Sequence, residues 1–230
     1  MVSRLQKEAT RLNGELISLA NSSDPYPRME KTLGLTRTCL ETLSKHECKI
    51  QVVTKSALVV RDIDVLQRTP SMVSISITTD DDAIAKSLEP HAPRPIERIQ
   101  ALEKLVRNGL PVSVRIDPII PFLNDDVAGL VKRIAAIGIP HITCSTYKAR
   151  HDNWKRLAQA FPNLARELRP LYFERGERRG RSFYLPKAMR QQILERVKEL
   201  VEREGMTFAS CREGIPQLNS ATCDGSWLLA

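Results

Sequence analysis

The chain has 230 residues and a formal net charge of +8, with 42% hydrophobic and 27% charged residues. These proportions are ordinary for a globular protein and exclude wholesale disorder. No apolar run approaches the roughly 20 residues that a membrane span requires, and the N-terminus lacks the apolar stretch of a secretion signal. The five cysteines have no tight spacing. That pattern is typical of a reducing compartment, so we expect a cytoplasmic protein.

Strand and helix signals alternate through the first 146 residues. The strand signals are continuous apolar runs separated by amphipathic helices, which predicts a parallel sheet covered by helices. Because parallel crossovers are right-handed, the sheet must be doubly wound or form a barrel. The predicted strands are 15–20, 49–54, 72–78, 111–117 and 140–145, and the predicted helices are 3–12, 34–46, 60–68, 95–108 and 125–137.

Beyond residue 146 the alternation ends. Helices are predicted over 154–164 and 186–204, the second from apolar residues at helical spacing. Between them a polar turn, 175–181, separates two aromatic pairs, and the tail from residue 207 is predicted to be irregular. We therefore expect a barrel-like region over 1–146 and a mostly helical extension over 147–230.

The positive charge is concentrated in this extension. Residues 1–146 carry 19 basic and 17 acidic side chains, whereas residues 147–213 carry 16 basic and 9 acidic ones. Clustered Lys and Arg side chains bind polyanions because they release counterions from phosphates. The extension therefore predicts a polyanionic partner such as nucleic acid.

Polar groups stand at the ends of successive predicted strands. Ser23 and Asp24 follow the first strand, Lys55 follows the second and Ser76 lies near the end of the third. Ligands of parallel α/β folds bind at this edge of the sheet. Any one of these groups alone is an ordinary polar strand end, but three in succession favour a binding site.

The fourth strand adds Arg115 and Asp117, which alternation places on one face. The guanidinium group of Arg115 can pair with Asp117 or with the carboxylate of a ligand. Both interpretations remain open from the sequence.

Together, these strand ends and the segment 115–125 resemble the core of the radical S-adenosylmethionine superfamily. The most similar branch is that of the spore photoproduct lyases and the archaeal DNA repair photolyase-like proteins. The resemblance implies a partial (β/α)6 TIM-like barrel in which the five strands correspond to strands two to six. It also implies that a 4Fe-4S cluster cleaves S-adenosylmethionine reductively to a 5′-deoxyadenosyl radical, the cofactor supplying the difficult chemistry.

The resemblance also assigns roles to residues. It implies that hydroxyls of Ser23 and Ser76 contact the amino and ribose groups of S-adenosylmethionine and that Lys55 reaches its carboxylate. Asp24 stands where many members have a Gly-Gly-Glu turn, so it can meet the methionine amine. The resemblance further makes Glu89 and Arg98 a structural ion pair.

The sequence departs from the superfamily in its cysteines, because it contains no Cys-x3-Cys-x2-Cys motif. The family carries this motif before the helix that residues 3–12 resemble. We therefore expect a truncated reading frame, inactive alone, or a natural half without its own cluster. Residues 21–23 read Asn-Ser-Ser where spore lyases have a hydrogen-donating cysteine, so repair by their route is not expected.

Two further groups have alternative interpretations. Cys211 and Cys223, separated by eleven residues, are structural thiols or ligands of a second cluster or metal. Four arginines near aromatic residues form either a nucleic-acid contact or a solvated hairpin; they are Arg175, Arg178, Arg179 and Arg181. The second interpretation of the whole chain is a non-catalytic nucleic-acid-binding protein on a barrel scaffold.

Overall fold

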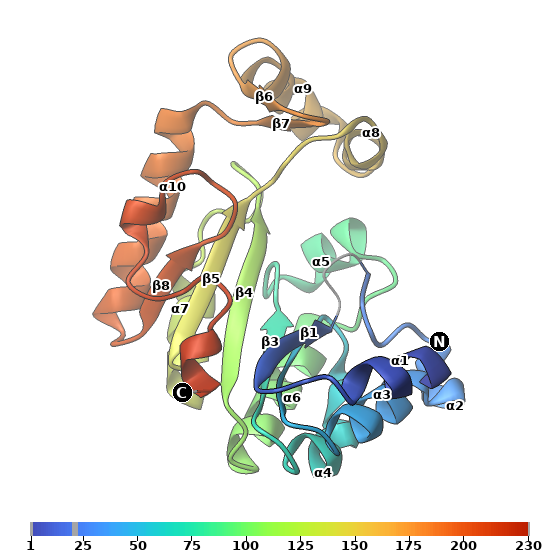
Figure 1. The fold of residues 1–230 in the computed structure, drawn as a ribbon. Coiled ribbons are helices and arrows are strands. Elements are labelled where there is room, and N and C mark those ends of the chain that lie inside the picture. Colours follow the sequence, from blue (N-terminus) through green and yellow to red (C-terminus); the bar gives the residue numbers. More distant parts are fainter. Residues whose placement is uncertain (1, 20–22, 230) are drawn as a thin grey trace.

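The structure, a computed structural model, describes residues 2–19 and 23–229. Its centre is a six-stranded parallel sheet that is open rather than closed into a barrel (Figure 1). The predicted α/β partial barrel is therefore confirmed. The strands, in their order across the sheet, are β1 (Glu15–Leu19), β2 (Cys48–Thr54), β3 (Ser71–Ser76), β4 (Val112–Ile119), β5 (His141–Thr146) and β8 (Thr207–Ser210).

Helices connect the strands and pack mostly on one face of the sheet (Figure 1). The α-helices are α1 (Val2–Ala9), α2 (Glu30–Leu33), α3 (Leu35–Leu43), α4 (Ile63–Leu66), α5 (Asp82–Leu88), α6 (Pro95–Arg107), α7 (Ala128–Ile137), α8 (His151–Ala160), α9 (Pro162–Phe173) and α10 (Lys187–Arg203). Short 3-10 helices are η1 (Ala57–Asp62), η2 (Pro216–Leu218) and η3 (Ser226–Leu229). None of the helices in the described ranges is long and apolar enough to span a membrane.

The face of the sheet under the helices is apolar. Val52, Ile75, Val114 and Ile142 lie on it in successive strands, and all four are fully buried in the core. Alternation along each strand places one residue in two on this face. The continuous apolar runs in the sequence therefore supply the core even though every second residue points away from it.

The opposite face of the sheet is polar, and the C-terminal tail covers part of it. The side-chain amide of Gln51 donates a hydrogen bond to the carbonyl of Asp224, and the Thr143 hydroxyl donates to the carbonyl of Cys223 at 2.9 Å. Gly225 has a φ of +72°, and a Cβ there would lie 3.1 Å from the methyl carbon of Met72. The tail thus approaches the sheet closely because its residue at this point is glycine.

The structure corrects three expectations about the C-terminal region. The tail is not irregular throughout, because β8 pairs with β5 and completes the sheet; the sheet therefore extends past the expected boundary at residue 146. The single helix predicted over 154–164 is wrong. Two helices meet at Pro162, which has no amide proton and therefore suits the first turn of the second helix, where that proton would have no partner. The predicted polar turn is a hairpin of β6 (Glu177–Arg179) and β7 (Ser182–Tyr184).

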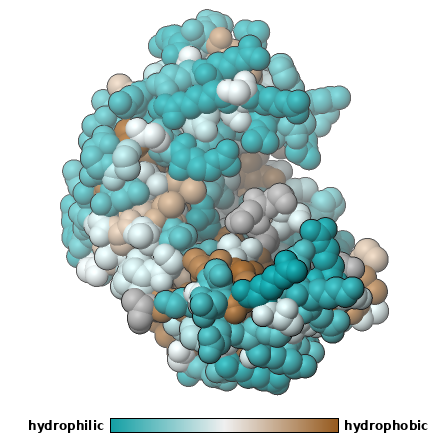
Figure 2. All heavy atoms as spheres, in the orientation of Figure 1, coloured by the Kyte–Doolittle hydropathy of each residue, from teal (hydrophilic) through white to brown (hydrophobic). Residues whose placement is uncertain are grey.

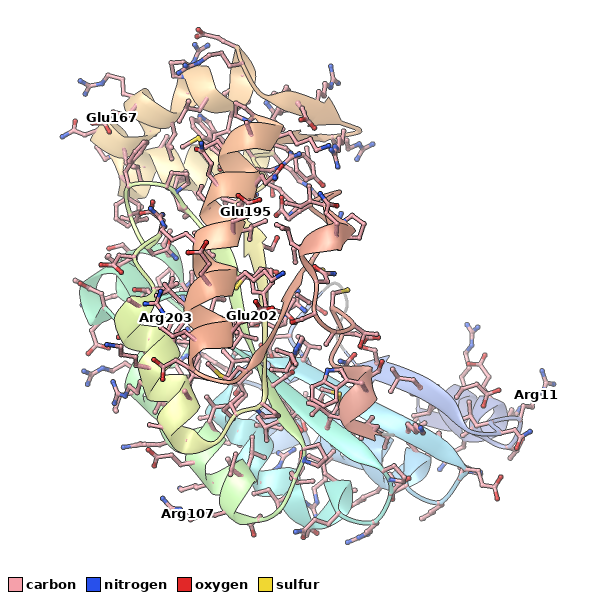
Figure 3. The ribbon with its side chains drawn as sticks, turned by 90° about the vertical axis from the view of Figure 1, so that its left-hand side faces the viewer. Arg11, Arg107, Glu167, Glu195, Glu202 and Arg203 are labelled. Atoms are coloured by element: carbon pink, nitrogen blue, oxygen red, sulfur yellow. The ribbon has the colours of Figure 1, made fainter. Side chains whose placement is uncertain are left out.

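The two helices and the hairpin form a lobe that extends beyond the carboxyl ends of β4 and β5 (Figure 1). Aromatic rings pack against one another inside the lobe. The centroid of the Phe173 ring lies 4.8 Å from the ring centroids of both Trp154 and Phe183. Figure 2 shows a mostly hydrophilic outer surface on the lobe and a hollow between it and the part of the molecule that carries β1 to β3. Figure 3 places Glu167, on α9, and Arg107, on α6, at opposite ends of the molecule.

Gly176 lies between α9 and β6, at a point in the lobe with no space for a side chain. A Cβ there would lie 2.3 Å from the carbonyl oxygen of Tyr172 and 2.4 Å from that of Tyr184. We expect Gly176→Ala to lower the free energy of unfolding by about 1–3 kcal/mol, because backbone must move to relieve the overlap.

The matched control is Gly129→Ala in α7, where the nearest atom to the new Cβ is 4.0 Å away. This change should raise stability by about 0.5–1 kcal/mol, because alanine loses less backbone entropy in a helix. Urea unfolding of both variants measures the difference. Equal stabilities would contradict the tight packing at Gly176.

Candidate functional site

The loops that follow β1, β2 and β3 enclose a cavity of about 940 Å³, called here the strand-end cavity. Pockets of this size are typical of sites for cofactors and other small molecules. The residues that line it come from 24–31, 55–58 and 89–97. The cavity therefore lies at the edge of the sheet where the sequence predicts a ligand.

Asp24 joins the first two of these loops. Its carboxylate accepts hydrogen bonds from the Thr54 hydroxyl and from the Lys55 backbone amide, both at 2.7 Å. It also accepts from the backbone amide of Tyr26 at 2.9 Å. Asp24 thus holds the loop after β1 against the end of β2, a structural contact that the sequence did not indicate.

Tyr26 lines the strand-end cavity and is fixed from behind by a buried acid. Its hydroxyl donates to Asp62 at 3.0 Å, and Asp62, which is fully buried, is paired with Arg37 and Arg61. Burial and the negative charge of Asp62 raise the pKa of Tyr26 far above its usual range. The phenol therefore remains protonated and holds the loop in one position.

Glu89 is shared by two cations at the end of β3. Lys55 Nζ contacts one oxygen and Arg98 Nη2 lies 2.6 Å from the other, so the predicted ion pair between Glu89 and Arg98 is confirmed. The Thr78 hydroxyl also donates to Glu89, and Arg98 donates to the Ser76 carbonyl at 3.0 Å. Burial alone would raise the pKa of Glu89, but Lys55 and Arg98 outweigh it and the pKa is lowered.

A second cavity, of about 490 Å³, lies on the polar face of the sheet and is called here the sheet-face cavity. Arg115 and Asp117 line it and are paired, with Nη2 3.1 Å from Oδ2. Of the two interpretations of Arg115, the structure shows the pair with Asp117. Burial lowers the pKa of Arg115, but Asp117 and the sulfur of Cys211 more than offset this, so the pKa is raised.

Glu213 fixes the loop that closes the sheet-face cavity. This buried carboxylate accepts from the Thr146 amide at 2.7 Å and from Lys148 Nζ at 2.8 Å, and Arg190 Nε lies 3.4 Å away. No pattern in the sequence pairs Glu213 with residues near 146, since 65 or more positions separate them. The contact holds the loop after β8 at the end of β5.

His141 lies under the tail on the same polar face. Its ring nitrogens contact the hydroxyls of Thr207, at 2.8 Å, and Thr143, at 3.1 Å, and its ring meets the edge of Trp227. Burial lowers the pKa of His141 to about 4. The imidazole is therefore a neutral part of the packing between sheet and tail.

The five cofactor-binding residues predicted from the sequence fall into two neighbouring groups. Asp24 and Lys55 line the strand-end cavity, beside the exposed Ser23, whereas Arg115 lines the sheet-face cavity. Ser76 is buried next to Arg115 in the sheet register and lines neither cavity. Val53, in β2, lines the sheet-face cavity, and Lys55, two residues further on, lines the strand-end cavity.

The two predicted cysteines lie away from the strand-end cavity. Cys211 and Cys223 are free thiols of the sheet-face cavity, and across residues 2–19 and 23–229 no three His, Cys, Asp or Glu side chains are arranged to hold a metal. Asn21 and Ser22, part of the segment that replaces the hydrogen-donating cysteine of spore lyases, lie outside the described residues.

The predicted nucleic-acid-binding residues line neither the strand-end cavity nor the sheet-face cavity. All four are exposed, on or beside the hairpin of the lobe: Arg175, Arg178, Arg179 and Arg181. Arg178 lies over the Phe183 ring and Arg179 over the Tyr184 ring, so these two arginines are on opposite faces of the hairpin.

Comparison with known sequences finds relatives, although no protein-family profile matches the chain. An uncharacterized protein of Mycobacterium tuberculosis is 28% identical over 202 residues, which are 82% of this chain and 57% of that protein. A protein of Methanocaldococcus jannaschii is 36% identical over 110 residues, 47% of this chain and 42% of that protein. The radical SAM Nalpha-GlyT isomerase of Pseudomonas phage M6 is 25% identical over 236 residues, 97% of this chain and 47% of that protein. The chain spans about half the length of these relatives.

Solved structures agree on the fold. A spore photoproduct lyase variant with dinucleoside spore photoproduct superposes with a TM-score of 0.63 at 15% identity, covering 88% of this chain and 62% of that one. SuiB of Streptococcus suis bound to S-adenosylmethionine gives a TM-score of 0.56 at 12% identity, covering 92% and 43%. The resemblance predicted from the sequence is confirmed, and the chain fits the radical S-adenosylmethionine superfamily.

The buried His141 predicts a pH dependence of stability. In the unfolded chain a histidine takes up a proton near pH 6.5, but the folded protein resists this until about pH 4. The free energy of unfolding should therefore fall as the pH drops from about 6.5 to 4, by about 3 kcal/mol from this group. Urea unfolding across this range measures the slope.

His141→Gln should remove most of that slope, whereas His46→Gln, at a half-buried histidine after α3, serves as the matched control. The His46 variant is expected to keep the wild-type slope. An unchanged slope in the His141 variant would show that this imidazole is not held neutral by the fold.

Proposed function

We propose that this chain binds S-adenosylmethionine in the strand-end cavity, as part of a radical S-adenosylmethionine enzyme of the spore photoproduct lyase-like branch. The observation that carries the proposal is the cavity itself, enclosed by the loops after three successive parallel strands and containing Lys55 beside Glu89. The fold shared with S-adenosylmethionine-bound SuiB supports it.

The residues present fit this cofactor. S-adenosylmethionine carries an amino group, a carboxylate, ribose hydroxyls and a flat adenine ring. The strand-end cavity offers the Lys55 ammonium group, whose side chain is 35% exposed, and the carboxylate of Glu89. Its apolar wall suits the adenine ring and includes Ala57, Leu58 and Pro93. Bound there, S-adenosylmethionine would supply the activated adenosyl group on which the chemistry of the superfamily depends.

Each residue has a separate part in binding. Glu89 holds the Lys55 ammonium group at the cavity, where it can pair with the carboxylate of the methionine moiety. Asp24 and Tyr26 hold the loop after β1 in place, so that the site does not have to be ordered by the ligand. The exposed Ser23 is proposed to contact the amino or ribose groups, whereas Ser76, which is buried and lines neither cavity, is not placed to reach them.

The residues present do not fit a 4Fe-4S cluster. Such a cluster needs several thiolate ligands, and the residues over 2–19 and 23–229 include no group of three that could hold a metal. We therefore derive no reaction step through a cluster, and the assignment concerns cofactor binding.

Binding of S-adenosylmethionine to the purified chain tests the proposal by calorimetry. We expect Lys55→Met to weaken binding about 10- to 100-fold, because a charge-assisted hydrogen bond to a carboxylate contributes roughly 1.5–3 kcal/mol. Lys49→Met, on the same strand but at its other end, is the matched control and should bind as the wild type does.

Adenosine separates the carboxylate contact from the rest of the site. Since adenosine has no carboxylate, its affinity should be the same for the wild type and for Lys55→Met. Absence of S-adenosylmethionine binding to the wild type, or an equal weakening in the Lys49 variant, would count against the site.

A second function, nucleic-acid binding, is favoured by the hairpin of the lobe. Arg175, Arg178 and Arg181 are exposed and have no acidic partner among the described residues, whereas Arg179 is paired with Glu177 at 2.8 Å. The Arg178 guanidinium lies over the Phe183 ring, 5.7 Å from its centroid. Arginine beside aromatic rings is a common surface for phosphates and bases.

Fluorescence anisotropy with a duplex DNA oligonucleotide tests this surface. Arg175→Gln/Arg178→Gln/Arg181→Gln should weaken binding and lower the slope of log affinity against log salt by up to roughly 2.7, at about 0.9 for each phosphate that an arginine no longer neutralises. The control with equal charge change is Lys104→Gln/Arg107→Gln/Arg133→Gln, at exposed positions of α6 and α7. Figure 3 shows Arg107 at the end of the molecule away from the lobe. An equal weakening in both variants would indicate a general charge effect instead of a binding surface.

A further inference from the structure

The structure brings together Cys211 and Cys223, which the sequence separates by eleven residues. Both line the sheet-face cavity, and both are anchored to adjacent residues of β5. The Cys211 amide donates to the carbonyl of Cys144 at 2.9 Å, and the Cys223 carbonyl accepts from the Thr143 hydroxyl at 2.9 Å. The side chains of both cysteines thus face the same cavity, and each sulfur influences the other electrostatically.

The surroundings of the two sulfurs differ. Arg115 lies beside Cys211 on the wall of the sheet-face cavity. Burial raises the pKa of Cys223, and the negative charges of Cys211 and Asp224 add to this, while Arg115 opposes it. Cys211 is therefore placed to attack first and Cys223 to react second.

We propose that Cys211 and Cys223 form a redox-active dithiol that reacts with low-mass disulfides entering the sheet-face cavity. The Cys211 thiolate attacks one sulfur of the small disulfide, which forms a mixed disulfide and releases one small thiol. The Cys223 thiolate then attacks the Cys211 sulfur and displaces the second small thiol. Two electrons and two protons pass from the protein to the small disulfide, and one S–S bond forms between the two cysteines.

The other cysteines are not placed for this reaction. Cys48 and Cys144 are buried, and burial raises the pKa of both thiols. Cys144 also lies on the apolar face of the sheet, because it follows the core residue Ile142 by two positions in β5. Cys39, half-buried in α3, does not line this cavity.

The bond would close a loop around the residues that cover the sheet. Residue 211 begins the segment that Glu213 anchors to the end of β5, and residue 223 is next to the carbonyl that accepts from Gln51. Oxidation would thus join the two anchored ends of the tail and restrict its release from the polar face. The reaction would change the stability of the tail without touching the strand-end cavity, so it does not depend on the proposed cofactor site.

The test equilibrates the full chain with oxidised glutathione and counts free thiols after denaturation. The count should fall from five to three, with peptide mapping showing the bond between Cys211 and Cys223 and a raised Tm that dithiothreitol reverses. Cys39→Ser, the matched control, should still lose two thiols. Cys223→Ser should accumulate glutathione on Cys211, whereas Cys211→Ser should accumulate much less on Cys223.

Three results would overturn the proposal. The first is a wild-type chain that keeps all five thiols at a glutathione potential that oxidises ordinary protein dithiols. The second is a bond that includes Cys39, and the third is equal glutathionylation of the two serine variants. Since the first two readouts use the unmodified chain, they hold even where a variant fails to fold.

Discussion

The fold depends on hydrogen-bond partners for the polar side chains on one face of the sheet, because these side chains are partly removed from water. One face of the parallel sheet packs on helices, but the other carries Gln51, Arg115, His141 and Thr143. Buried polar groups are costly unless they find hydrogen-bond partners. The C-terminal tail provides these through the carbonyls of residues 223 and 224, and β8 extends the sheet beneath it. The tail is thus a structural part of the barrel-like region.

Buried carboxylates solve the same problem at the strand ends. Asp62 and Glu213 are buried and Glu89 is half-buried, and each is paired with at least one cation from a distant part of the chain. A buried charge of this kind is tolerated only where its partners and hydrogen bonds are all in place. Each carboxylate therefore fixes the relative position of two loops, and the strand-end cavity is preformed because its loops are joined in this way.

The two cavities divide the proposed chemistry between them. The strand-end cavity has the size, cation and apolar wall suited to S-adenosylmethionine, and the hairpin lobe rises above the same end of the sheet. The sheet-face cavity holds the paired thiols and is closed by the tail. Val53 and Lys55 are two residues apart at the end of β2, and each lines one of the two cavities.

The amino-acid sequence was enough to predict the five parallel strands and the resemblance to the superfamily, and that resemblance in turn implied the pair of Glu89 and Arg98. It could do so because apolar runs and strand-end motifs are local signals. Tertiary structure alone decided that β8 joins the sheet, since four residues carry too little pattern and are held by pairing with β5. It also decided that Arg115 and Lys55 line different cavities and that Cys211 meets Cys223. Those contacts join residues that the chain separates widely, and only the closure of loops around the sheet brings them within reach.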